Sequence, residues 1–275
     1  MKLKYIFLLV SLSIFTLSYG QKRLVILHTN DTHSRIEPMP ATDRTFPSMG
    51  GVINRKAVID SVREVEKNIL LIDAGDFVQG TPYFNMFHGR VETGAMNIMK
   101  YDVGTIGNHE FDYGLDTMKM MIERLKYPIV NCNYDFSATV LKDLVKPYII
   151  LKRNGIKIGI LGVGVDPEGL IQKDKYEGMK FRPVIESVNR YAKTLKEEKK
   201  CDIIICVSHI GIQDDKILAE SSRYINVIIG GHSHTIMDEP VIKKNLDGKD
   251  ILIYQVGKNG AYIGKTVLAL QEQYY

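Results

Sequence analysis

Five stretches of this chain repeat one pattern, in which an apolar run of strand length is followed by a turn carrying Asp, Asn or His. Strands of a buried, mostly parallel sheet deliver their carboxyl ends to one edge, where α/β folds place ligands. Polar residues far apart in the sequence can therefore meet there, and these residue types are the ones that metal sites use. The runs are Leu24–Leu27, Ile69–Ile72, Val103–Ile106, Ile203–Val207 and Ile225–Ile229, and five of the seven histidines fall in the turns after them.

Helical and strand patterns alternate along the chain, which predicts helices packed outside a sheet. Helices are expected at 52–67, 91–100, 115–126, 184–198 and 213–221, and a short strand at 129–131. Residues 148–152 and 157–165 have the pattern of a hairpin, and 251–256 and 263–270 are expected to be antiparallel strands, so the sheet is mixed. No repeat or linker interrupts residues 21–275, which predicts a single domain there.

Residues 1–20 have the composition of a secretory signal peptide. Two lysines precede an apolar run, Ile6–Leu17, that is too short to span a bilayer comfortably, and the small residues Ser18 and Gly20 stand where a signal peptidase reads. Cleavage after Gly20 is expected, with an uncleaved anchor as the alternative. Residue 21 is Gln, so no lipid-modified N-terminus is expected. The mature protein is predicted to be secreted or periplasmic, with no membrane-spanning segment.

Charge and cysteine content exclude several functional classes. The chain has 36 basic and 32 acidic residues, and its formal charge of +4 includes two lysines of the leader. This near balance argues against nucleic-acid binding and against electrostatic adhesion to a membrane. Cys132, Cys201 and Cys206 have no disulfide or metal-binding spacing, so they are predicted to be buried free thiols.

Two of the turns carry carboxylates at spacings that suit a metal ion. Asp31 and His33 are two residues apart, which places both side chains on one side of an extended chain. Asp73 and Asp76 follow the second strand, and Gly75 permits a tight turn that would aim Asp76 at the same edge. Either motif alone also fits a surface loop, and Asp73 fits either the orientation of a ligand or the capping of a turn.

The next two turns contribute an amide and two imidazoles. Asn108 offers a hard oxygen ligand to a metal ion. Asp112 stands three residues after His109, where its carboxylate can hold the imidazole tautomer and raise the imidazole pKa for general acid catalysis. His209 directly follows a buried strand, which in a histidine taken singly is typical of a structural role.

The last turn, Gly230–His234, repeats the two-residue spacing with His232 and His234, after glycines that let the backbone approach another group closely. The two remaining histidines fit no motif, and we expect His28 to be structural or to support a ligand and His88 to be exposed. Five polar turns on strand ends would cost stability without an ion to hold, so together they favour a metal site.

The five turns look like the five signature blocks of the calcineurin-like metallophosphoesterases, in order and in spacing. Three segments are similar to the 5′-nucleotidase branch in particular: His28-Thr29-Asn30-Asp31-Thr32-His33, Asp73-Ala74-Gly75-Asp76 and Asn108-His109-Glu110-Phe111-Asp112-Tyr113-Gly114. The resemblance implies a mixed α/β fold, a four-layer αββα sandwich of two mixed β-sheets flanked by helices.

The resemblance also implies a centre with two divalent metal ions, such as Mn, Zn, Co or Fe. Carried over by position, one ion would be held by Asp31, His33, Asp76 and His234, and the other by Asp76, Asn108, His209 and His232. Asp76 would bridge the ions. His109 and Asp112 match the catalytic dyad, and Asn108 and His109 would contact the substrate phosphate. Some relatives have Gln or Asn in place of His234, so the histidine is expected to alter metal preference.

The implied function is that of an exported, metal-dependent phosphoesterase acting on 5′-nucleotides or related phosphomonoesters through a metal-bridging hydroxide. Charge counting agrees, because two carboxylates and a hydroxide would leave roughly +1 on the two ions to attract a phosphate. The alternatives are a phosphodiesterase or cyclic nucleotide hydrolase, and a sulfohydrolase of the same fold.

The nucleotidases that the chain resembles carry a second, C-terminal domain with the base-binding residues, whereas this chain stops at Tyr275. Two alternatives follow: a separately encoded nucleotidase domain is a partner that docks here, or the substrate is some other phosphoester. The non-enzymatic alternative is an idle subunit that binds such a partner, but the intact residues at all seven ligand positions weigh against it.

Overall fold

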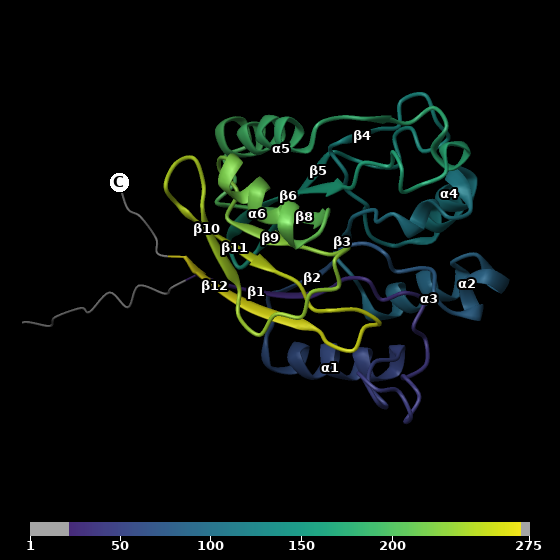
Figure 1. The fold of residues 1–275 in the computed structure, drawn as a ribbon. Helices are drawn as coiled ribbons and strands as arrows, with labels where there is room; N and C mark the ends of the chain where they lie inside the picture. The colour runs from purple at the N-terminus through teal and green to yellow at the C-terminus, as the bar shows by residue number, and fades with distance from the viewer. Residues whose placement is uncertain (1–21, 271–275) are drawn as a thin grey trace, which may run out of the picture.

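The computed structural model describes residues 22–270, in which two β-sheets pack face to face between helices (Figure 1). The strands are β1 (Lys22–Thr29), β2 (Ile69–Asp73), β3 (Val103–Gly104), β4 (Tyr134–Asp135), β5 (Tyr148–Arg153), β6 (Ile156–Gly164), β7 (Lys180–Phe181), β8 (Ile203–His209), β9 (Val227–Ile229), β10 (Val241–Lys244), β11 (Asp250–Tyr254) and β12 (Gly264–Leu270). The helices are α1 (Val52–Val65), α2 (Pro82–Phe87), α3 (Arg90–Met99), α4 (Gly114–Arg124), α5 (Val184–Lys193) and α6 (Ile212–Ser221), with short turns η1 (His109–Phe111), η2 (Lys173–Tyr176) and η3 (Thr194–Glu198).

Both large sheets are mixed. The first has the order β12-β1-β2-β3 and the second the order β10-β11-β9-β8-β6-β5, while β4 and β7 form a small separate pair. β12, β5 and β10 run antiparallel to their neighbours, and the remaining neighbours in the large sheets are parallel. The mixed sheets flanked by helices confirm the predicted fold class.

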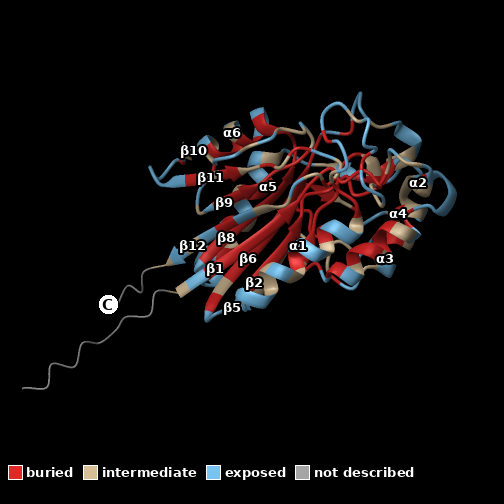
Figure 2. Cartoon of the chain, turned by 90° about the horizontal axis from the view of Figure 1, so that it is seen from below, coloured by how far each residue is buried: buried red, intermediate tan, exposed pale blue. Residues whose placement is uncertain are grey.

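Alternation along each strand sends successive side chains to opposite faces of a sheet. In β1, Leu24 packs in the core between the two sheets, whereas Val25 packs against the outer helices α1, α3 and α4. In β8, Ile205 lies between the sheets and Ile204 faces α5 and α6. The inner strands β2, β8 and β9 are accordingly buried on both faces, whereas the edge strands β5, β10 and β12 are partly exposed (Figure 2).

The last two expected strands are present, but they do not pair with each other. β11 joins the second sheet between β9 and β10, and β12 pairs with β1 in the first sheet. The chain between them crosses from one sheet to the other, with Gly257 and Gly260 at positive φ. α2 was not predicted, the expected strand at 129–131 forms only isolated bridges, and the helix expected to reach residue 198 widens into a π-turn, η3, after Lys193.

The predicted signal peptide lies outside the described residues, and the domain boundary at residue 21 stays a prediction. Within residues 22–270, no helix has both the length and the apolar character needed to cross a bilayer. The three cysteines are buried and free, as the sequence predicted.

His28 should make the protein less stable in acid. Its imidazole is 1% exposed, its Nδ1 has no hydrogen-bond partner, and burial lowers its pKa from 6.5 to about 4. The unfolded chain therefore binds a proton that the folded chain does not, so stability falls as the pH drops from 6.5 to 4, by roughly 3 kcal/mol. Urea unfolding at several pH values should show a flatter dependence for His28→Gln than for the wild type. The same substitution at exposed His88 is the control, and an unchanged slope in His28→Gln would contradict this account.

Candidate metal centre

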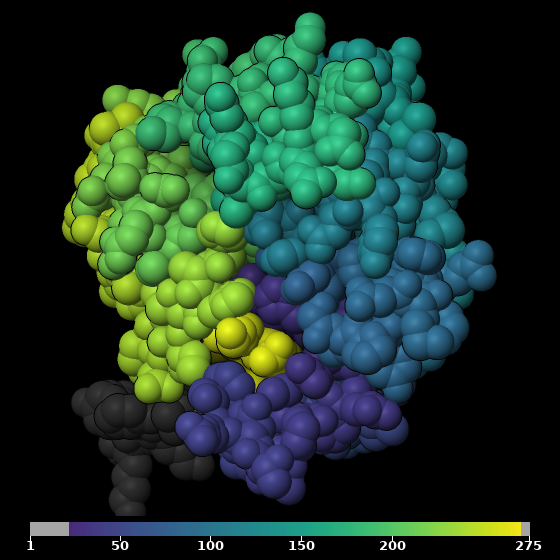
Figure 3. All heavy atoms as spheres, turned by 45° about the vertical axis from the view of Figure 1, so that its right-hand side comes forward, coloured from purple at the N-terminus to yellow at the C-terminus, as the bar shows by residue number. Residues whose placement is uncertain are grey.

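The turns singled out in the sequence meet at one edge of the sandwich. In the first sheet Thr29 of β1 lies beside Asp73 of β2, and in the second Gly164 of β6 lies beside His209 of β8, so parallel strands end together in both sheets. On the face shown in Figure 3, segments from the first part of the chain (purple and blue) and from its end (yellow) border a hollow. This edge is where an α/β fold places ligands.

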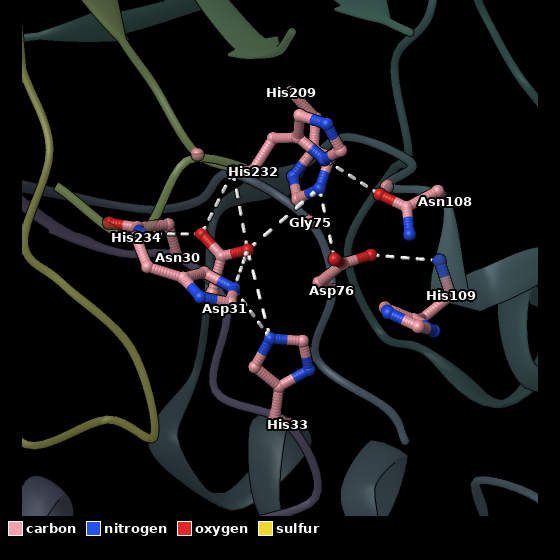
Figure 4. A network of polar contacts seen from close by, with 12 residues as sticks. Asn30, Asp31, His33, Gly75, Asp76, Asn108, His109, His209, His232 and His234 are labelled. Carbon is pink, nitrogen blue, oxygen red and sulfur yellow. Dashed lines mark hydrogen bonds and ion pairs between the residues drawn. The ribbon is translucent and has the colours of Figure 1, made fainter. Parts of the chain in front are cut away.

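One cluster is formed by Asp31, His33 and His234, from the loops after β1 and β9. The Nε2 atoms of His33 and His234 are 3.0 Å apart, and Asp31 Oδ1 is 3.3 Å from the His234 Nε2 and 3.8 Å from the His33 Nε2 (Figure 4). One possible ligand atom from each residue lies within 4.8 Å of the other two. Asp31 is fully buried, so its charge has little access to water.

A second cluster is formed by Asp76, His209 and His232, whose possible ligand atoms also lie within 4.8 Å of one another. Asp76 Oδ2 is 3.1 Å from His209 Nε2, and the Nδ1 of His232 is 2.9 Å from the amide oxygen of Asn108. The clusters adjoin, because His209 Nε2 is also 3.9 Å from the Oδ1 of Asp31. The structure thus brings together all seven residues named as ligands from the sequence (Figure 4).

Five of these seven residues have left-handed backbone conformations, with φ between 46° and 74°: Asp31, His33, Asp76, His232 and His234. Such conformations cost about 1 kcal/mol or more in residues other than glycine, and they persist where surrounding contacts enforce them. Here the loops hold one another: the Asp31 amide donates to Gly75 O, the His33 amide to Asp76 O, and the His232 amide to the Asp31 carboxylate. Backbone strain concentrated in this way is typical of a functional site.

The donor set fits a cation. The Nδ1 of His209 is 2.6 Å from the carbonyl oxygen of Ala74, to which it donates, so in the neutral ring Nε2 carries a lone pair. That buried Nε2 has no hydrogen-bond partner and faces the Asp76 carboxylate. Although burial alone would lower the His209 pKa, the Asp76 and Asp31 carboxylates raise it to about 10. The site therefore draws positive charge to this nitrogen, as a divalent cation would supply.

His109 and Asp112 lie beside the clusters and form the expected pair. The Nδ1 of His109 is 3.1 Å from Asp112 Oδ2, and the His109 amide donates to Asp76 Oδ1. Burial lowers the His109 pKa, but the Asp112 hydrogen bond and the Asp76 charge outweigh it, so the net pKa is raised. Its ring also forms a third group with His33 and Asp76 in which possible ligand atoms lie within 4.8 Å.

A model of the calcineurin-like phosphoesterase family matches residues 24–235, which is well over half of the chain and includes every residue of both clusters. The chain belongs to this family. The phosphoesterase is 34% identical over 273 residues to an apyrase of Tabanus yao, covering 90% of this chain and 48% of the apyrase. It is 29% identical over 283 residues to the 5′-nucleotidase of Homo sapiens, covering 92% of this chain and 48% of the human protein.

The fold of this calcineurin-like phosphoesterase is similar to that of a 5′-nucleotidase precursor from Thermus thermophilus. The TM-score is 0.85 at 32% sequence identity, and the match covers 90% of this chain and 52% of the other. The chain spans about half the length of the curated relatives it matches.

Several supporting residues of the phosphoesterase were given no role from the sequence. The Glu110 carboxylate accepts hydrogen bonds from the amides of Asp76, Phe77 and Gly107, and burial followed by the Asp76 charge raises its pKa to about 8. Glu110 thereby fixes the Asp76 loop to the Asn108 loop. The one sequence feature that could have pointed to this role of Glu110 is its place within the Asn108-His109-Glu110 block.

The segment after β11 supports the other loops. The side chain of Asn30 donates to Asp31 Oδ2 and to Gly257 O, and accepts from the Val256 amide. The Gln255 amide group donates to Gly231 O and accepts from the Thr235 amide, which holds the loop of His232. Nothing in the local pattern of the sequence predicts contacts between residues this far apart.

Asp73 takes the second of its two expected roles. Its carboxylate accepts from the Thr29 hydroxyl at 2.6 Å and from the Gly75 amide at 3.1 Å, so it caps the turn that leads to Asp76. Burial raises its pKa to about 7. His88 is exposed, as expected, and its ring lies edge-on against Tyr113.

Gly231→Ala should weaken metal binding. A Cβ atom at Gly231 would lie 2.8 Å from His209 Nδ1 and 2.9 Å from Ala74 O, so it would disturb the hydrogen bond between them, which orients the His209 ring. Disturbing the group that orients a ligand typically lowers metal affinity by about 10- to 100-fold. Calorimetric titration with Zn²⁺ or Mn²⁺ measures the change. The control is Gly94→Ala in α3, where an added Cβ atom would meet no neighbouring element within 4 Å. Wild-type affinity in Gly231→Ala would contradict this account of how His209 is oriented.

Proposed function

We propose that this calcineurin-like phosphoesterase hydrolyses phosphomonoesters of small organic molecules, 5′-nucleotides first among them, with two divalent cations bound at the sheet edge. The observation that carries the proposal is the pair of adjoining clusters, Asp31–His33–His234 and Asp76–His209–His232. Relatives that include an apyrase and 5′-nucleotidases support the choice of nucleotides.

The residues divide between the two cations as the family resemblance implies. Asp31, His33 and His234 would hold one, and Asn108, His209 and His232 would hold the other, with Asp76 shared. The carboxylate of Asp76 suits the shared position because it is within reach of both His209 and His33. When bound, two such cations act as Lewis acids on the phosphate and lower the pKa of a bound water.

The other side chains act directly on the phosphate ester. The amide nitrogen of Asn108 would donate to a phosphoryl oxygen while its Oδ1 serves as a ligand. His109 would carry a proton on Nε2 and give it to the departing oxygen, since its Nδ1 is engaged by Asp112. Asp112 is a positioning residue, because its carboxylate holds the His109 ring and favours the protonated imidazole.

Export through the predicted signal peptide is part of this proposal, and a secreted or periplasmic location follows from it. The support is the composition of residues 1–20. None of the comparisons bears on a separately encoded partner domain, which stays a prediction from the sequence.

Metal dependence and substrate choice test the proposal together. The chelator-treated protein should be inactive, and Mn²⁺, Zn²⁺ or Co²⁺ should restore hydrolysis of AMP. A cyclic nucleotide and bis(p-nitrophenyl) phosphate, assayed in parallel, would reveal a phosphodiesterase instead. Hydrolysis of none of these esters at any metal concentration would refute the proposal.

A further inference from the structure

A cavity of about 480 Å³ lies beside the metal centre, where the loop after β6 meets the first turn of α5 and the helix α6. α5 and α6 pack against each other on the outer face of the second sheet (Figure 1). His232, a proposed metal ligand, also lines this cavity. A phosphate bound at the metal centre would therefore place the rest of its ester close to the cavity opening. The volume is in the range of small-molecule sites.

The cavity walls are apolar, although they open to solvent. Leu170, Ile185 and Ile217 line it from three separate segments, and they are 50%, 38% and 52% exposed. Ile210 and Leu218 form buried parts of the wall. Large apolar side chains that converge from different segments and stay exposed are typical of a binding site.

The charges of the cavity restrict what it can hold. Asp166 and Asp214 are the acidic residues that line it, and no Lys or Arg is among its lining residues, all of which belong to the described part of the chain. A second phosphate or a carboxylate bound within the cavity would meet two carboxylates and no Lys or Arg side chain. An uncharged ring would gain apolar contact with the walls.

We propose that this cavity binds an uncharged, planar aromatic ring of the leaving group, such as a nucleobase or a phenyl ring, and thereby determines which phosphomonoesters are cleaved. The inference rests on the proposed phosphoesterase function. Leu170, Ile185 and Ile217 would select the organic part of the substrate. Asp166 and Asp214 would discriminate against substrates that carry a second anionic group.

AMP and ribose 5-phosphate form a matched pair of substrates, because both release a 5′-alkoxide and only AMP carries a nucleobase for the cavity. Ile217→Ser should lower the ratio of kcat/KM for AMP to that for ribose 5-phosphate by roughly tenfold, the size of effect that apolar contacts in a pocket produce. The control is Ile53→Ser at an exposed position of α1, which should keep the wild-type ratio. An unchanged ratio in Ile217→Ser overturns the proposal.

A second pair of substrates, phenyl phosphate and 4-carboxyphenyl phosphate, tests the role assigned to Asp166 and Asp214. The wild type should prefer phenyl phosphate, and Asp214→Asn should narrow that preference by roughly threefold, as expected for one exposed charge. A wild-type preference for the carboxylated ester would overturn the assignment to the two carboxylates.

A binding measurement separates failure of this inference from failure of the proposed function. Adenosine has the ring but no phosphate, so it should bind the chelator-treated protein in a ligand-observed NMR titration, and Ile217→Asp should abolish the signal. If no phosphate ester is hydrolysed, the proposed function fails, but the titration still tests whether the cavity binds the adenine ring. Equal adenosine binding by Ile217→Asp and the wild type, or binding by neither, overturns the cavity proposal.

Discussion

Asp76→Ala is expected to leave the protein without its metal ions and without measurable activity. Asp76 belongs to the second ligand cluster and also lies within reach of His33 in the first, which is why we propose that its carboxylate is shared; it is 2% exposed. Burial opposes its ionised form, but the neighbouring His209 leaves the Asp76 pKa lowered, so the carboxylate is charged and available at neutral pH. Because Lewis-acid stabilisation of a phosphoryl transition state is worth several kcal/mol, kcat/KM should fall by roughly a thousandfold or more. Elemental analysis of the purified variant measures the metal content.

Thermal unfolding provides a second readout for the same substitution. Ions that bind only the folded state raise the melting temperature of the wild type, and this increase should vanish in Asp76→Ala. Asp116→Ala, at an exposed acid of α4, should bind metal like the wild type. If Asp76→Ala retained both ions, the shared position would have to be assigned to another residue.

His109→Ala should also lose most of its rate but, unlike Asp76→Ala, should keep full metal occupancy. Loss of a positioned general acid typically costs about 10²- to 10⁴-fold in rate. The proposed ligands Asp76, His209 and His232 stay in place without the His109 ring, since the contact of His109 with Asp76 is made by its backbone amide. Steady-state kinetics and elemental analysis of the same preparation give both quantities.

The metal content of His109→Ala distinguishes two possible roles of His109, general acid and metal ligand. The ring of His109 lies near His33 and Asp76, so it could itself serve as a ligand. Loss of one or both ions from His109→Ala would assign it that role and remove it from proton transfer. His88→Ala, at an exposed histidine outside the clusters, is the matched control.

The fold could be predicted largely from where apolar runs end. The runs in β1, β2, β8 and β9 are buried on both faces, and such runs in alternation with helices indicate parallel strands covered on both sides. The pairing of β11 and β12 could not be predicted, because short local patterns contain no information about which sheet a strand joins. In the structure, β12 lies antiparallel to β1 at the opposite end of the described chain.

The candidate ligands were predictable because each lies at the end of a strand or shortly after it, and strand ends have a fixed position in the fold. The side chains that hold the ligands are different. Glu110 and Gln255 act through backbone amides and carbonyls of remote loops, which no residue spacing reveals. The cavity beside His232 depends on the relative position of α5, α6 and the loop after β6, so it needed a three-dimensional structure.

The crossing from β11 to β12 limits how this protein can be shortened or recombined. The family match ends at residue 235, yet the Asn259 amide donates to Asp31 O at 2.7 Å, and Gly257 O accepts from Asn30. A chimaera that exchanged only the matched portion would place a foreign segment against the loop of Asp31 and pair β1 with a β12 from another protein. The smallest transplantable unit therefore runs through Leu270, and functional swaps among relatives should place their junctions beyond that point.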